Sequence, residues 1–182
     1  MYFKNFPVIP YDSVGDGSVK FVTNLLRRVA IRQKVKTNAL LYDTYDIKQG
    51  ESPESIADKL YGDPELHWVV MLVNDITDRY HQWPMTYAQF LQFVNDKYTD
   101  PNAAHHYEIA QSSGDTTKTI EVYANSALYS GDTDFYNTAT TITNIEYEDN
   151  RQDELRKIRL LDPQYVGQFV EEYETLMKES IV

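Results

Sequence analysis

The sequence predicts an α+β fold, with a β-α-α core, flanking helices, a β-rich insertion and a C-terminal amphipathic helix. Two observations support this prediction. Ser-Pro or Asp-Pro pairs stand where helices should begin, and apolar residues recur behind them at helical spacing. Segments 40–48 and 101–150 instead contain many β-branched and aromatic residues bounded by turn residues, which is typical of strands.

The N-terminal part is expected to be an extended arm followed by a short element. Pro7 and Pro10 favour extended backbone. Ser18 is placed to cap a short helix whose apolar residues follow helical spacing: Val19, Val22, Leu26 and Val29. A strand is the alternative, since valine-rich segments also favour strands.

The β-α-α core begins at residue 40. The stretch LLYDTYDIK (40–48) predicts a strand that ends at the turn Gln49-Gly50. Ser52-Pro53 places a capping oxygen before a proline at the first helical position, and this helix is expected to end near Gly62. Asp63-Pro64 opens a second helix in the same way.

The second helix is apolar on almost every side. Only His67 and Asn74 leave a polar gap around its circumference. The apolar residues that fill the rest are Leu66, Trp68, Val69, Val70, Met71, Leu72 and Val73. A helix of this kind must be covered on more than one face, so we expect it to pack on its own sheet and on something else.

Further elements follow the core. Thr86-Tyr87-Ala88-Gln89 is a capping box, and the spacing behind it predicts an amphipathic helix over 87–98. Strand-like stretches then cover 105–111, 118–124 and 138–148, with turns at Ser113-Gly114-Asp115 and Ser130-Gly131-Asp132. LRKIRLL (155–161) predicts a strand, and Asp162-Pro163 opens the last helix.

These elements predict four segments. They are an N-terminal arm with a short helix (1–39), the core unit with the helix after it (40–99), the β-rich insertion (100–150), and a strand with a C-terminal helix that packs back on the core (151–182).

Charge and tyrosine content favour contacts with proteins over contacts with nucleic acid. A formal net charge of −11 argues against binding to a phosphate backbone. A local basic run is better explained as a solvated helix face or a patch for an acidic protein: Arg27, Arg28, Arg32, Lys34 and Lys36. The 15 tyrosines suit surfaces that meet other surfaces, with a wet aromatic core as the alternative.

The compartment is expected to be a reducing cytoplasm. The chain has no cysteine, and its N-terminus lacks the pattern of a secretory signal. The longest apolar run, Trp68 to Val73, is far too short to span a bilayer, so no membrane is expected as a partner.

No catalytic constellation is recognisable. The adjacent His105 and His106 should point to opposite sides of a strand and so chelate a metal poorly. Carboxylates come in runs that usually mark solvated faces: Glu146, Glu148 and Asp149, then Glu171, Glu172 and Glu174. No serine elbow and no glycine-rich phosphate loop is present. We therefore expect no enzyme, no cofactor and no metal.

The core resembles a LysM module. The residues that carry this resemblance are Tyr45, Ile47, Gly50, Glu51, Ser52, Ser55, Ile56, Ala57, Tyr61, Gly62, Leu72 and Asn74. The resemblance implies a small β-α-α-β fold, and many LysM modules bind N-acetylglucosamine polymers. Two departures count against sugar binding here: Pro53 stands where such modules usually have leucine, and no clear second strand follows Asn74.

GDPELHWVVMLVND with a following Trp-Pro, and the ending NRQDELRKIRLLDPQYVGQFVEEYETLMKES, resemble the LysM-containing baseplate wedge family of contractile-tailed bacteriophages, baseplate wedge protein 53. The resemblance covers residues 38–98 and 150–180. It implies a structural subunit of the virion tail baseplate, assembled in the host cytoplasm, with other wedge proteins as partners and hub or sheath-initiating proteins as further candidates. The residues expected to pack or to form an interface are Trp68, Val70, Leu72, Trp83, Phe169 and Tyr173.

The alternative function is a peptidoglycan-binding LysM module, or an accessory of a cell-wall hydrolase, acting through residues near Gly50, Glu51 and Ser52. Pro53 and the lack of a secretory signal make glycan binding the less favoured interpretation.

Overall fold

The computed structural model describes residues 2–27, 29–36, 38–110, 119–123 and 133–179. The fold combines helices and strands, as predicted. The chain divides into two compact units, unit 1 formed by residues 1–83 and 157–182 and unit 2 formed by residues 84–156. The predicted segment 40–99 is therefore shared between the units.

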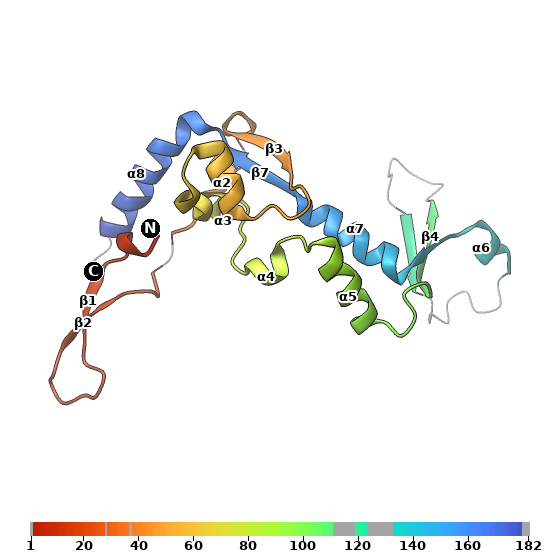
Figure 1. Ribbon diagram of the computed structural model, residues 1–182, viewed down its shortest axis with the longest axis horizontal. Helices are drawn as coiled ribbons and strands as arrows, with labels where there is room; N and C mark the ends of the chain where they lie inside the picture. Colours follow the sequence, from red (N-terminus) through yellow and green to blue (C-terminus); the bar gives the residue numbers. More distant parts are fainter. Residues whose placement is uncertain (1, 28, 37, 111–118, 124–132, 180–182) are drawn as a thin grey trace. The chain divides into compact units, whose positions relative to one another are not determined.

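Unit 1 is built around a two-stranded antiparallel sheet. Strand β3 (Tyr42–Asp46) pairs with β7 (Lys157–Leu161), so that Tyr42 lies opposite Leu161 and Asp46 opposite Lys157. Helices α2 (Pro53–Tyr61) and α3 (His67–Val73) follow β3 and pack against this sheet (Figure 1). The second strand, which does not follow Asn74 in sequence, is supplied by residues 157–161. Along the chain, β3, α2, α3 and β7 therefore follow the order β-α-α-β, and unit 2 is inserted before β7.

Local signals explain where α2 begins and ends. The Ser52 side chain accepts the Ser55 backbone N–H, and the Ser55 hydroxyl accepts the Ser52 N–H, which forms a capping box before Pro53. The helix ends at Gly62, whose φ of 72° lies in the left-handed region that glycine adopts without steric cost. Both predicted boundaries are confirmed.

Helix α3 lies between two hydrophobic clusters, as its sequence predicts. It follows the 3₁₀ turn η3 (Pro64–Leu66). On the sheet side, fully buried Val70 packs with Ile56 of α2 and Ile158 of β7. On the other sides, α3 contributes Trp68, Val69 and Val73 to a second cluster with Tyr42, Leu161, Val166, Tyr173 and Met177. The prediction that this helix is covered on more than one face is confirmed.

The second cluster joins α3 to the C-terminal helix α8 (Pro163–Glu179). The rings of Trp68 and Tyr173 lie 4.4 Å apart between centroids, and Trp68 also stacks on Phe169 at 6.2 Å. Aromatic pairs of this kind add about 0.5–1.5 kcal/mol beyond the burial of their area. The shorter elements of unit 1 are η1 (Tyr2–Asn5), α1 (Gln33–Lys36), η2 (Ala39–Leu41) and α4 (Arg79–Gln82).

The N-terminal segment forms a β-hairpin. Strand β1 (Val8–Tyr11) pairs antiparallel with β2 (Lys20–Thr23). The predicted short helix after Ser18 is therefore wrong, and the strand alternative holds because β-branched residues fit extended backbone. In the connecting loop, the Asp12 carboxylate accepts the N–H groups of Gly15 and Gly17, both of which have positive φ.

Unit 2 contains helices α5 (Tyr87–Lys97), α6 (Thr133–Thr138) and α7 (Asn144–Arg156). Its sheet has the order β5-β4-β6, formed by β4 (Ala104–Ala110), β5 (Thr119–Tyr123) and β6 (Thr140–Thr143). The predicted helix over 87–98 and the first two predicted strands are confirmed at these positions. The predicted turns at 113–115 and 130–132 lie outside the described residues.

The predicted strand over 138–148 is correct only at 140–143. Helix α7 begins at Asn144 because Thr143 and Glu146 form a capping box: the Glu146 carboxylate accepts the Thr143 N–H, and the Thr143 hydroxyl accepts the Glu146 N–H. The Thr-x-x-Glu pattern is a signal that the sequence contains. The predicted strand at 155–161 is confirmed from Lys157 onward, after α7 ends.

Candidate functional site

The turn after β3 contains the polar residues of the motif that resembles LysM. The Tyr45 hydroxyl donates to the Glu51 carboxylate, with 2.9 and 2.8 Å to its two oxygens, and Glu51 also accepts the Lys48 N–H at 2.9 Å. Lys59 Nζ lies 3.5 Å from the same carboxylate and 3.3 Å from the Tyr45 hydroxyl. The turn is thus closed by a network within the chain, and Gly50 lies exposed at its tip.

The network sets the charge of its members. Burial would raise the pKa of Glu51, but the Lys48 N–H, the Tyr45 hydroxyl and the Lys59 charge outweigh it and lower this pKa below its ordinary value. Burial and the hydrogen bond to Glu51 raise the pKa of Tyr45. The carboxylate is therefore ionised and the tyrosine neutral near pH 7, the states in which Tyr45 donates to Glu51.

Two further motif residues stabilise the sheet through hydrogen bonds to the backbone of β7. The Tyr61 hydroxyl donates to the Leu161 carbonyl at 3.1 Å, and burial of this side chain raises its pKa to about 12. Asn74 donates from Nδ2 to the carbonyls of Val70 and Arg159 at 2.8 and 2.7 Å, while its Oδ1 accepts the Arg159 N–H at 2.8 Å. The Asn74 amide thus pairs with β7 as the peptide group of a third strand would.

Three apolar motif residues lie in the hydrophobic core. Ile47, Ile56 and Ala57 belong to the cluster on the sheet side of α3. Most of the motif is thereby accounted for structurally: its polar members close a turn and hold a strand, and these three apolar members fill the core between them.

The six residues expected to pack or to form an interface do not all reach the surface. Trp68, Val70, Trp83 and Tyr173 are buried within unit 1, at most 8% exposed. The Trp83 indole donates to the Glu51 carbonyl at 2.9 Å, which ties α4 to the turn. Leu72 and Phe169 are only partly buried and line a groove at the surface of the unit.

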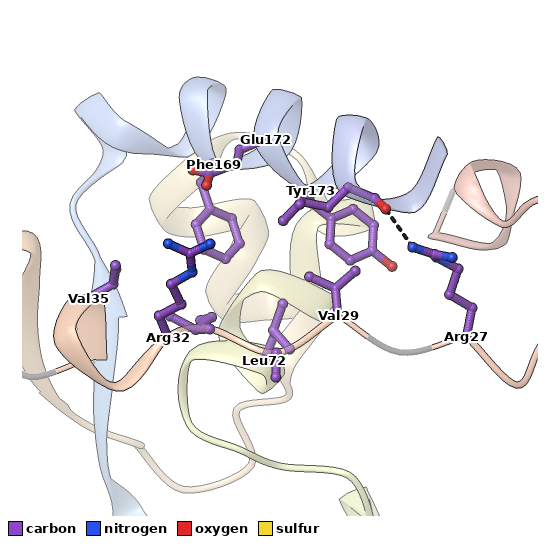
Figure 2. Close-up of a pocket in the computed structure, with 11 residues that line it drawn as sticks. Arg27, Val29, Arg32, Val35, Leu72, Phe169, Glu172 and Tyr173 are labelled. Atoms are coloured by element: carbon purple, nitrogen blue, oxygen red, sulfur yellow. Dashed lines mark hydrogen bonds between the residues drawn. The ribbon is translucent and has the colours of Figure 1, made fainter. Parts of the chain in front are cut away.

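This groove has a volume of about 440 Å³ and is lined by Arg27, by the segment 29–35, and by residues of α8 and α3. Figure 2 shows Phe169 and Tyr173 pointing from α8 toward the segment that carries Val29 and Arg32. Leu72 of α3 also lines the groove. At one end the Arg27 guanidinium donates to the Leu176 carbonyl of α8 at 2.8 Å, which fastens the segment to the helix (Figure 2).

The comparison with known proteins gives these features a context. The profile of the family described as base plate wedge protein 53 matches residues 1–178, nearly the whole chain. The chain belongs to this family. Baseplate wedge protein gp53 of Enterobacteria phage T4 is 30% identical to it over 95 residues, a stretch that covers 52% of this chain and 43% of the T4 protein. The match thus spans less than half of the length of that relative.

Unit 2 of this wedge-family protein contains a buried ion-pair network that the sequence does not reveal. Glu148, expected on a solvated face, is 1% exposed. Its carboxylate lies 2.6 Å from Lys97 Nζ, accepts the Tyr98 hydroxyl at 2.8 Å and lies 3.4 Å from Arg151. The expectation fails because Lys97 and Tyr98 stand at the C-terminal end of α5, and sequence spacing does not show which helix faces α7.

A testable consequence concerns acid stability. Burial raises the pKa of Glu148, but hydrogen bonds from Lys97 and Tyr98 and the charges of Lys97 and Arg151 outweigh it, so this pKa lies below its ordinary value. A carboxylate with a depressed pKa stabilises the folded state above its unfolded pKa and loses that effect as pH falls, here from about pH 5 downward. We expect Glu148→Gln to destabilise unit 2 by about 1–3 kcal/mol at pH 7.

Hydrogen exchange of peptides from α5 and α7 measures this effect in unit 2. Relative to the unaltered protein, the variant should exchange faster at pH 7, and the difference should shrink as the pH approaches 4. Glu154→Gln on the same helix, at an exposed position, is the matched control. Equal exchange in Glu148→Gln and Glu154→Gln at pH 7 would contradict the role of this network.

The histidine pair of unit 2 is arranged differently from the prediction. The expectation that His105 and His106 point to opposite sides is wrong, since their Nδ1 atoms lie 2.9 Å apart. The ladder of β4 with β6 shifts register between Ala104 and His106, and such a bulge redirects a side chain. His105 also stacks on Tyr147 of α7, with 3.8 Å between ring centroids. Burial and the neighbouring His106 lower the pKa of His105, which favours a neutral, packed ring.

No three histidine, aspartate or glutamate side chains lie together as metal ligands in the described part of the chain. Among the described helices, none combines the length and apolar character needed to cross a membrane.

Proposed function

We propose that this protein is a structural subunit of the baseplate wedge in the tail of a bacteriophage, and that it joins wedge proteins and neighbouring wedges around the hub through protein–protein contacts. The observation that carries this proposal is the match of the wedge family profile to residues 1–178. The surface of unit 1 supports it, because exposed apolar side chains gather on the N-terminal hairpin and in the turn just after it, with Phe21 at 79% and Leu26 at 91% exposure. Such surfaces usually mark contacts with other proteins.

The core of unit 1 is proposed to be a LysM-like scaffold put to structural use. The β-α-α-β order and the antiparallel pairing of β3 with β7 support this interpretation. The last strand would then follow the insertion of unit 2 instead of following Asn74 directly.

A non-enzymatic role is part of the proposal. Two carboxylates described above, Glu51 and Glu148, are each used to hold elements of their own unit together. A carboxylate whose oxygens accept several donors and whose pKa is depressed is poorly suited to general acid catalysis at neutral pH.

Peptidoglycan binding through the turn near Gly50, Glu51 and Ser52 is less well supported. The Glu51 carboxylate, its carbonyl and the Ser52 hydroxyl already accept hydrogen bonds from Tyr45, Trp83 and Ser55. A sugar chain would have to share these acceptors with the chain's own donors or displace those donors.

Removal of the gene from its phage tests the proposal. We expect infected cells to accumulate wedge proteins without complete baseplates, and a plasmid copy of the gene to restore them. Electron micrographs of negatively stained lysates report the outcome, and a copy carrying Val70→Asp serves as a folding-defective control. Normal tails in the absence of the gene would contradict the proposal.

A further inference from the structure

The groove of unit 1 lies in a part of the chain with unusual charge. Residues 17–42 contain six of the 17 lysines and arginines and none of the 28 aspartates and glutamates. The rest of the chain therefore carries 11 positive and 28 negative side chains. A basic segment in an otherwise acidic protein attracts anionic partners and fixes the register in which they bind.

The walls of the groove are apolar and aromatic. Leu72, Phe169 and Leu176 line it, and Leu176 is 40% exposed. Its volume of about 440 Å³ is in the range of pockets that accept a ligand or a few side chains. Aromatic residues and arginine are the residue types enriched at protein interfaces, and both kinds meet here.

An arginine, Arg32, is among the residues that line the groove. Arg32 is exposed, and among the described residues its side chain forms no ion pair. Nearby Lys36, by contrast, is paired with Asp75 at 2.5 Å. An arginine presents a planar fork of donors that matches a carboxylate, so Arg32 is positioned to bind one from an incoming segment.

One carboxylate, Glu172 of α8, also lines the groove. It repels an anionic group placed at its side of the groove. A bound segment must therefore place its carboxylates near Arg32. Its own apolar side chains must lie against Leu72 and Phe169.

We infer that this groove is a docking site for an acidic segment of another protein, one in which carboxylates flank apolar side chains. This inference rests on the proposed function. A second copy of the chain fits the groove poorly. Its exposed large apolar side chains lie mainly in residues 8–26, near the basic run and not in an acidic segment. The two copies would also repel each other, since each carries a net charge of −11.

Photo-crosslinking in assembled tails tests the docking site. Benzoylphenylalanine replaces Leu176 in a plasmid copy that complements the phage without the gene, tails are purified and irradiated, and the crosslinked peptides are mapped by mass spectrometry. We expect a crosslink to a segment of a different protein that carries carboxylates beside apolar residues.

Charge variants sharpen the test. Arg32→Glu in the same copy should reduce the crosslink yield at least fivefold, whereas Glu172→Gln should leave it equal or higher. Lys157→Glu, the same charge change at an exposed residue of β7, is the matched control and should leave the yield unchanged. Tryptophan fluorescence checks that each variant is folded, since Trp68 and Trp83 both lie buried in unit 1.

Several outcomes would overturn the inference. They are tails that contain the chain but give no crosslink, a crosslink to a second copy or to a segment without carboxylates, and equal effects of Arg32→Glu and Lys157→Glu. Complete tails that lack the chain would instead contradict the proposed function, and this inference would fall with it.

Discussion

Replacing Val70 with aspartate is expected to unfold unit 1, with a loss of at least about 4 kcal/mol in its free energy of unfolding. Val70 is 0% exposed and lies between α3 and the sheet, among Ile56, Trp83 and Ile158. The donors of that cluster, the Trp83 indole and the Tyr45 and Tyr61 hydroxyls, already bond to Glu51 and Leu161, so a carboxylate at position 70 would have to break these bonds to gain a partner among them. Because domains of this size are stable by about 5–15 kcal/mol, one such change removes a large part of the total.

Urea denaturation followed by tryptophan fluorescence measures this prediction. Both tryptophans of the chain lie in unit 1, so the signal reports that unit alone. Val70→Ala should lose about 2 kcal/mol through the cavity it leaves. Val19→Asp is the matched control at a 55% exposed valine and should change the stability by less than about 0.5 kcal/mol. A Val70→Asp protein as stable as the Val19→Asp protein would show that α3 is not enclosed as described.

Replacing Asn74 with alanine is expected to cost unit 1 about 2–4 kcal/mol. The substitution removes three hydrogen bonds at 2.7–2.8 Å and leaves the N–H and carbonyl of Arg159 without their partner. These two groups lie on the edge of β7 that is not paired with β3. The loss therefore loosens the strand from α3 as well as removing the bonds themselves.

Asn74→Asp separates the roles of donor and acceptor. At pH 7 the carboxylate still accepts the Arg159 N–H but faces the carbonyls of Val70 and Arg159, so we expect a deficit at least as large as that of Asn74→Ala. As the pH falls, the protonated carboxyl regains a donor, because hydrogen bonding to the neutral form raises the pKa of such a group. The deficit of Asn74→Asp relative to the unaltered protein should then shrink between pH 7 and pH 4, while that of Asn74→Ala stays constant. Parallel curves for the two variants would argue against this bonding pattern.

The helices α2 and α5 could be predicted because their boundaries depend on neighbours in sequence. Ser52 and Ser55, or Thr86 and Gln89, satisfy backbone groups within one turn, so the signal is local and complete. The apolar circumference of α3 was equally informative, because it predicted that the helix is covered on more than one face. The hairpin was harder to predict, since Val19 and Val22 suit a strand as well as a short helix.

Pairing across the chain could not be predicted in the same way. Nothing near Asp46 or Lys157 states that their strands pair, and the inserted unit 2 hides the β-α-α-β order. Buried Glu148 was missed because α7 has few apolar residues to mark an inward face; a network of polar partners holds it instead. The groove could not be predicted for a related reason. The sequence shows that this segment is basic, but it does not show that the segment lies beside α8.

Electron cryo-microscopy of intact tails from the phage that encodes this chain tests the central claim most directly. The account predicts density for unit 1 in every baseplate wedge, with α3 enclosed by the chain's own sheet and α8, and with a segment of another protein in the groove beside Arg32. Baseplates that hold no copy of the chain, in cells where the protein is made, would contradict it.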